Sequence, residues 1–167
     1  MIDRHGTPVS LSSFDFVVNI NLRGTVDLIR QLLPIMIKNE PFGSEPGDGE
    51  RGVLVLVSSV AAFDGQPGQL AYSASKGAVA SMTLPLARDI AQYGIRAVTI
   101  APGVFTSAMT DMMNEKVRKS LEGVMEFPKR MGKAEEFASL VSQVITNRML
   151  NATVLRLDGG VRMPSKM

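Results

Sequence analysis

Apolar side chains near the start of the chain recur at helical spacing. Ser10 precedes this stripe, and its hydroxyl suits the cap of a first helical turn. Intervals of three and four residues place the apolar positions on one side of an α-helix. The pattern predicts one long helix over residues 10–38, with Pro34 disturbing its last turns. The stripe consists of Phe14, Val17, Val18, Thr25, Leu28 and Leu32.

Uninterrupted apolar runs, in contrast, predict buried strands. Residues 53–57 read VLVLV, residues 95–103 read IRAVTIAPG, and residues 152–160 read ATVLRLDGG. Continuous β-branched sequence is typical of a strand that is covered on both faces. Between the first two runs, residues 70–93 have small side chains and helical character, and Gly94 is expected to end that helix. One or two further helices are expected before the third run.

The alternation of strands and helices predicts parallel pairing with right-handed crossovers. We therefore expect an α/β fold, the C-terminal part of a doubly wound, Rossmann-like parallel sheet with flanking helices. Three strands are few for such a sheet, so residues 1–167 are expected to form a single domain that lacks the first strands. Residues 40–52, rich in Gly, Pro and acidic side chains, are predicted to form a solvated loop.

Composition restricts the possible partners and compartments. The net charge of +2 comes with no block of Lys or Arg, which argues against nucleic acid or an anionic membrane as a partner. The chain has no cysteine and a single histidine, His5, so no metal site is predicted. It shows no secretory signal and no apolar run of the ~20 residues that a membrane span needs. We expect a soluble cytoplasmic protein, with the mitochondrion as the alternative in a eukaryote.

One glycine motif matches the dinucleotide fingerprint G-x-G-x-x-G in its letters only. Gly47, Gly49 and Gly52 precede a predicted strand, whereas the fingerprint must follow a strand and open a helix. Asp48 and Glu50 lie between these glycines and would repel a phosphate. We therefore reject a phosphate-binding role for this motif.

A second motif, Ser73 and Lys76 in the pattern S-x-x-K, is the nucleophile and base of penicillin-recognising acyltransferases. The companion motifs S-D-N and K-T-G are absent from the sequence, which argues against acyl transfer. This reaction is nevertheless the rival enzymatic hypothesis.

Tyr72 and Lys76 stand four residues apart in the second predicted helix and so project from one face. A nearby ammonium favours the phenolate, which would bring the pKa of a tyrosine toward the range useful for proton transfer. The alternative interpretation is that Tyr72 and Lys76 form a solvated surface pair without a catalytic role. Ser59 favours the catalytic reading, because it follows the first strand at the carboxyl edge where open α/β sheets bind ligands.

Two further positions support a site at this edge. Pro102 and Gly103 end the second strand there, and a glycine allows close approach of the backbone to a ligand. Asn21 lies on the apolar stripe, where a buried amide needs hydrogen-bond partners. Capping a neighbouring turn is the alternative role for Asn21. The small residues around Tyr72 would leave room for a flat cofactor.

Four segments together resemble the short-chain dehydrogenase/reductase family. They read NINLRG, VSSVAAFDGQPGQLAYSASKGAV, IRAVTIAPG and RLDGG, and they span nearly the whole chain. The resemblance implies a catalytic site of Asn21, Ser59, Tyr72 and Lys76. In such enzymes the tyrosine transfers the proton, the serine orients the substrate oxygen, the lysine holds the nicotinamide ribose and lowers the pKa of the tyrosine, and the asparagine anchors a water relay.

The resemblance also implies a cofactor, a substrate class and partners. NAD is the expected cofactor, with NADP as the alternative, and the substrate is a secondary alcohol or ketone on an acyl-CoA or a steroid. Gln66 is expected to line the substrate pocket, and the Met-rich segment of Met109, Met112 and Met113 to form a substrate lid or adaptable core. A homo-oligomer, dimer or tetramer, is expected. The residues matched to the cofactor are Tyr72, Lys76, Pro102, Gly103, Val104, Phe105, Thr106 and Ser107.

Several segments of the family pattern have no counterpart in the chain. These are the opening strand, the glycine-rich turn, the residue that reads the adenosine ribose and the Asn-Ala-Gly strand. We expect either a start codon assigned too far downstream or a truncated product. The alternative functions are a non-catalytic module that pairs with a full-length relative, through the helices that carry Asn21 and Tyr72, and 3-oxoacyl-carrier-protein reduction.

Overall fold

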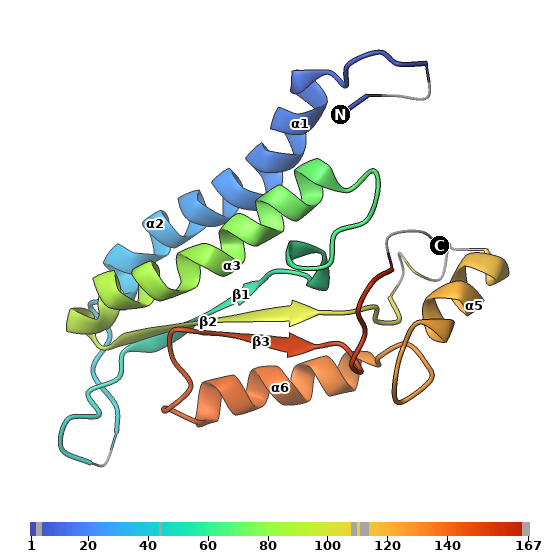
Figure 1. Cartoon of the computed structure of the whole chain (residues 1–167). Coiled ribbons are helices and arrows are strands. Elements are labelled where there is room, and N and C mark those ends of the chain that lie inside the picture. The colour runs from blue at the N-terminus through green and yellow to red at the C-terminus, as the bar shows by residue number, and fades with distance from the viewer. Residues whose placement is uncertain (3–4, 44, 108–109, 111–113, 165–167) are drawn as a thin grey trace.

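The computed structural model describes residues 1–2, 5–43, 45–107, 110 and 114–164 (Figure 1). Within these ranges, no helix is both long and apolar enough to cross a membrane. The residues expected to form a Met-rich lid, Met109, Met112 and Met113, lie outside the described residues. The elements in chain order are α1 (Leu11–Val18), a π-helical segment (Asn19–Arg23), α2 (Gly24–Met36), β1 (Gly52–Val57), α3 (Leu70–Ile90), β2 (Ile95–Pro102), α5 (Glu115–Gly123), α6 (Ala134–Thr146) and β3 (Thr153–Leu157).

The sheet has three parallel strands in the order β1-β2-β3, which confirms the α/β fold expected from the sequence. Leu54 of β1 pairs with Ala97 of β2, and Ile100 of β2 pairs with Leu155 of β3. Because the strands are parallel, their carboxyl ends meet at one edge of the sheet. Within the described residues β1 is an edge strand, and Val57 at its end is exposed.

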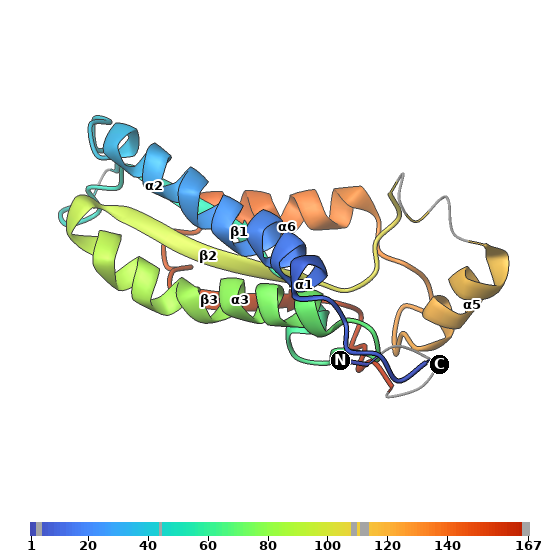
Figure 2. The same ribbon diagram turned by 90° about the horizontal axis from the view of Figure 1, so that it is seen from above.

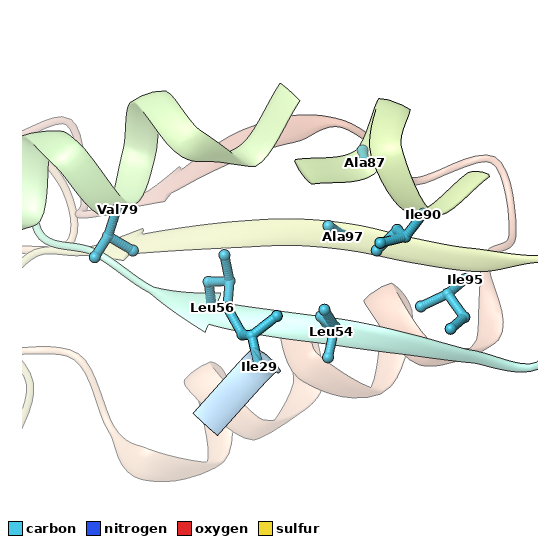
Figure 3. Close-up of a cluster of buried hydrophobic side chains, with 8 residues drawn as sticks. All are labelled: Ile29, Leu54, Leu56, Val79, Ala87, Ile90, Ile95 and Ala97. Carbon is cyan, nitrogen blue, oxygen red and sulfur yellow. The ribbon is translucent and has the colours of Figure 1, made fainter. Parts of the chain in front are cut away.

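Helices cover both faces of the sheet (Figure 1). One face carries α1, α2 and α3, and the view from above shows these helices running beside one another along the strands (Figure 2). Ile29 of α2 and Val79 of α3 meet Leu56 of β1 in this layer (Figure 3). On the other face, Val144 of α6 packs with Val98 and other residues of β2. Successive side chains along a strand point to opposite faces of the sheet, so each face has its own apolar cluster.

The first helix differs from the sequence prediction in its register. Leu28 and Leu32, expected on the buried stripe, are 59% and 38% exposed, whereas Ile29 is 7% exposed and Leu33 packs against the core. Thr25 stays half-buried after the π-helical segment, and Ile29 and Leu33 follow it at intervals of four residues, so the buried face keeps ordinary helical spacing. The helix continues through Pro34 to Met36.

Both predicted helix caps are present. The Ser10 hydroxyl accepts a hydrogen bond from the backbone N–H of Ser12 at the start of α1. Gly94 has φ of 69°, the left-handed conformation that ends a helix, and it leads directly into β2. A Cβ atom at Gly94 would lie 2.3 Å from the carbonyl oxygen of Gly49, so the position admits only glycine without rearrangement.

Candidate functional site

Two serines follow β1 at the carboxyl edge of the sheet. The Ser58 hydroxyl donates to the backbone carbonyl of Lys76 at 2.7 Å and so joins the strand end to α3. The Ser59 hydroxyl accepts from the backbone N–H of Ala61 at 3.1 Å and caps a short 3-10 turn, Val60–Ala62. The proton of the Ser59 hydroxyl is not used by this contact, so it can be donated to a ligand oxygen.

Tyr72 and Lys76 lie on one face of the first turns of α3, as their spacing predicts. The Lys76 ammonium is 5.9 Å from the centroid of the Tyr72 ring and donates a hydrogen bond of 2.9 Å to the carbonyl of Val57. Burial lowers the pKa of Lys76, because desolvation disfavours the ammonium. Tyr72 is 37% exposed, so a ligand can reach it.

Asn21 occupies the π-helical segment and contacts the same helix. Its amide nitrogen donates to the Ser75 hydroxyl at 3.1 Å, and that hydroxyl donates to the backbone carbonyl of Tyr72 at 2.8 Å. The backbone carbonyl of Asn21 accepts from the Thr25 hydroxyl at 2.8 Å. Asn21 therefore reaches Tyr72 through Ser75 and the backbone. π segments of this kind are frequent at functional sites.

The segment after β2 is fixed by hydrogen bonds to its neighbours. The Gly103 N–H donates to Leu157, and the Thr106 N–H donates to the carbonyl of Gly132 at 2.8 Å. Gly103 packs so closely on β3 that an added Cβ would lie 3.0 Å from Asp158. The backbone from Pro102 onward is thereby held across the end of the sheet.

These elements enclose a cavity of about 630 Å³ at the carboxyl edge. Ser59 and Tyr72 line it from one side, Gln66 from the loop before α3, and Phe137 from α6. The described lining leaves out Asn21, which contacts α3 through Ser75, and Lys76, which bonds to the end of β1. All six residues expected after β2 line the cavity: Pro102, Gly103, Val104, Phe105, Thr106 and Ser107.

Several lining residues were not identified from the sequence. Phe137 and Leu121 lie on predicted helices, where apolar spacing indicates core rather than a site, and Met163 follows the last strand. Gln69, Thr110 and Ala134 also line the cavity, together with Val60 and Ala61. Ser75, which was counted among the small residues that leave room for a cofactor, does not line the cavity and instead accepts a hydrogen bond from Asn21.

The two rival motifs serve other purposes in the structure. The Ser73 hydroxyl is buried beside Gly65 and has no hydrogen-bond partner within the described part of the chain, whereas Lys76 bonds to Val57. The pair therefore lacks the contact that a nucleophile and its base require. Asp48, from the glycine motif, forms an ion pair with Arg148 at the opposite end of the sheet.

Within the described residues, no group of three His, Cys, Asp or Glu side chains is placed to hold a metal ion. The polar side chains that line the cavity carry hydroxyls and amides, and the Lys76 ammonium lies next to Tyr72. A serine hydroxyl, a tyrosine hydroxyl and a nearby cation can bind a carbonyl oxygen and exchange a proton with it.

Comparisons with known proteins find relatives over most of the chain. The family model for short chain dehydrogenase matches residues 4–118. The chain is 50% identical over 154 residues to 3-hydroxyacyl-CoA dehydrogenase type-2 of Rattus norvegicus, covering 92% of this chain and 58% of that protein. It is 47% identical over 160 residues to the Homo sapiens protein of the same name, covering 96% of this chain and 60% of that protein. The chain thus spans about 58% of the length of such relatives.

A solved structure shows the same likeness. The crystal structure of 3-hydroxyacyl-CoA dehydrogenase type-2 from Mycobacterium avium superposes with a TM-score of 0.91 at 35% identity, covering 99% of this chain and 62% of that one. Sequence and structure agree over nearly the full length described. The chain therefore belongs to the short-chain dehydrogenase family.

Proposed function

We propose that the chain is part of an NAD(P)-dependent oxidoreductase that interconverts a secondary alcohol and a ketone. The observation that carries this proposal is the shared cavity of Ser59 and Tyr72, with Lys76 next to the tyrosine on the same helix face. Enzymes of the family generally use NAD or NADP, and we propose NAD because the relatives at 47–50% identity are named 3-hydroxyacyl-CoA dehydrogenases.

The side chains divide the proton chemistry between them. Ser59 donates a hydrogen bond to the substrate oxygen and fixes its position. During reduction the Tyr72 hydroxyl gives its proton to that oxygen, and during oxidation the phenolate takes it back. The Lys76 ammonium, held beside the ring, stabilises the phenolate by its charge. Asn21 and Ser75 hold the first turn of α3 so that the Tyr72 hydroxyl stays in place.

The residues present fit the reactive end of a nicotinamide dinucleotide. The cofactor, when bound, supplies or accepts the hydride. The segment from Pro102 to Ser107 would hold the nicotinamide end, since it lines the cavity beside Tyr72. Lys76 would hold the ribose by exchanging its hydrogen bond to Val57 for one to a sugar hydroxyl. Within the described residues, no G-x-G-x-x-G turn follows a strand and opens a helix to bind the pyrophosphate, so this fit covers one end of the cofactor only.

The substrate class follows from the cavity walls and the relatives. Val60, Val104, Phe137 and Met163 give the cavity apolar walls around the hydroxyls of Ser59 and Tyr72, which suits an acyl chain or a steroid. We propose a 3-hydroxyacyl-CoA as the substrate and a hydroxysteroid as the alternative. A 3-oxoacyl-carrier-protein substrate is less well supported, because the Thermotoga maritima reductase for it is only 34% identical.

An assay of NADH absorbance with 3-hydroxybutyryl-CoA and NAD tests this proposal. The 167-residue chain and the in-frame product of the DNA that includes its upstream region would be assayed in parallel. We expect turnover from at least the longer product, since the chain spans about 58% of its relatives. NADP and a hydroxysteroid serve as the competing cofactor and substrate. Absence of turnover from both products with every pair would overturn the assignment.

A second candidate function is association with another copy of the chain or a full-length relative, without turnover. The observation that favours it is a set of exposed apolar side chains along the first helix, Phe16 and Ile20 before α2 and Leu28 and Ile35 within it. Burying such side chains against a partner is favourable by ~25 cal/mol for each Å² of apolar surface. Sedimentation velocity is expected to show a dimer or larger species that Leu28→Ser dissociates. A monomer at micromolar concentration would contradict this.

A further inference from the structure

Arg156, at the end of β3, joins segments from three parts of the chain. Its Nη2 atom donates to Asp64 Oδ2 at 2.6 Å and to the backbone carbonyl of Val161 at 3.0 Å. Its Nε atom donates to Asp158 Oδ2 at 2.7 Å. The guanidinium also lies 5.4 Å from the centroid of the Phe63 ring, where a cation is attracted to the aromatic face. One side chain thus contacts the loop after β1, the end of β3 and the C-terminal segment.

The segments that Arg156 joins are walls of the cavity. The loop after β1, residues 58–69, supplies Ser59 and Gln66, and the segment after β3, residues 158–164, supplies Met163. Figure 1 shows this last segment rising in red from the end of β3 past the end of β2. The Gln66 amide donates to the carbonyl of Pro164 at 3.3 Å, so the two walls also meet at their far ends.

The contacts of Arg156 with Asp64 and Asp158 are partly buried and join oppositely charged groups. The side chains of Arg156, Asp64 and Asp158 are 23%, 18% and 9% exposed. Hydrogen bonds between ionised groups are roughly twice as strong as neutral ones, and a shielded pair is screened less by salt than an exposed one. Without the guanidinium, the two carboxylates would lose their common cation and repel each other. The part of the loop around Asp64 would then separate from β3 and from the C-terminal segment.

We propose that Arg156 is a positioning residue that sets the width of the substrate cavity and thereby its preference for acyl-chain length. Arg156 does not line the cavity itself, but it fixes the wall that carries Gln66 against the wall that carries Met163. Loss of the Arg156 contacts moves the walls that carry Gln66 and Met163 apart and widens the cavity at a distance from Ser59 and Tyr72. Binding of a short acyl chain then weakens while proton transfer continues. This inference rests on the proposed function for its kinetic consequence only.

Arg156→Gln and Asp64→Asn each remove one partner of the Arg156–Asp64 ion pair, and Arg156→Lys keeps the positive charge. The matched control is Arg162→Gln, because Arg162 also contacts Asp158 and the carbonyl of Val161 but is 65% exposed and makes no bond to Asp64 within the described residues. Hydrogen exchange of the whole chain, measured without cofactor or substrate, reports directly whether the two wall segments stay closed against each other. We expect Arg156→Gln and Asp64→Asn to speed exchange at least tenfold in residues 60–69 and 158–164, with smaller changes in Arg156→Lys and Arg162→Gln.

The kinetic readout uses a series of 3-hydroxyacyl-CoA chain lengths. We expect Arg156→Gln to raise KM for the four-carbon substrate about tenfold or more, with kcat within about threefold and a smaller rise for long chains. Faster exchange throughout β3 and α6, or equal effects in Arg162→Gln, would show that Arg156 has a purely structural role and overturn the proposal. If the unaltered protein turns over no substrate, the proposed function fails, and the exchange experiment alone decides whether Arg156 holds the walls together.

Discussion

Replacing Tyr72 with phenylalanine should lower turnover of a 3-hydroxyacyl-CoA by roughly 10²–10⁴-fold, the usual contribution of a positioned acid or base. The substitution removes one hydroxyl and keeps the ring, so the packing of α3 and the contact with Lys76 are retained. Ser59 would still bind the substrate oxygen, and KM should therefore change much less than kcat. Steady-state NADH absorbance with the active form of the protein measures both constants.

Tyr93 provides a matched control for this experiment. It is the other of the two tyrosines, and it lies after α3 next to Gly94, at the opposite end of the sheet from Ser59. Tyr93→Phe removes the same hydroxyl and is expected to leave kcat within about twofold, as is usual for a change distant from the reacting atoms. Full activity in Tyr72→Phe, or equal losses in the two variants, would show that the Tyr72 hydroxyl does not carry the proton.

Replacing Arg96 with alanine should lower the free energy of unfolding by about 3–5 kcal/mol, because it removes the nearer cation of the buried Glu50 carboxylate and leaves, among the described residues, only Arg148, whose Nε lies 3.6 Å from Glu50 Oε2. Arg96 Nη2 donates to Glu50 Oε1 at 2.9 Å, and the two side chains are 9% and 5% exposed. Arg96 also donates to the carbonyls of Val144 at 2.9 Å and Leu150 at 2.7 Å, which satisfies backbone groups at the end of α6. Urea denaturation measures the loss.

An exposed ion pair is the control for the buried one. Lys119 and Glu115 form a 2.8 Å pair on α5 with 72% and 78% of their side chains exposed. Lys119→Ala is expected to cost no more than about 1 kcal/mol, the usual range for a surface pair. The double variant Arg96→Met with Glu50→Gln should cost less than the sum of its single changes, because no unpaired charge remains. A loss below about 1 kcal/mol in Arg96→Ala would contradict the proposed role of this pair.

The largest departure from the sequence-based expectations concerns the first helix. Its existence, its Ser10 cap and its approximate length were predictable, because apolar spacing and capping depend on neighbouring residues. The choice of Ile29 over Leu28 as the buried residue was not, since both positions fit helical spacing. The sequence has apolar side chains at both positions, so packing against the sheet decides between them.

The candidate site also has features that the sequence predicted and features that it did not. The spacing of Tyr72 and Lys76 predicts a common helix face, and the position of Ser59 after a buried strand predicts a place at the carboxyl edge of the sheet. The sequence did not indicate that Asn21 contacts Ser75, at a separation of 54 residues, or that Arg156 contacts Asp64, at a separation of 92. Both contacts join segments whose approach depends on how the layers pack.

By itself the sequence determined the order and type of the elements, the parallel sheet and the face that carries Tyr72 and Lys76, because short-range sterics and periodicity fix these features. The tertiary structure alone decided the burial of Ile29 rather than Leu28, the bond of Lys76 to Val57 and the walls that enclose the cavity. Those features depend on which distant atoms come within hydrogen-bonding distance. Those contacts form only when the helices pack against the sheet.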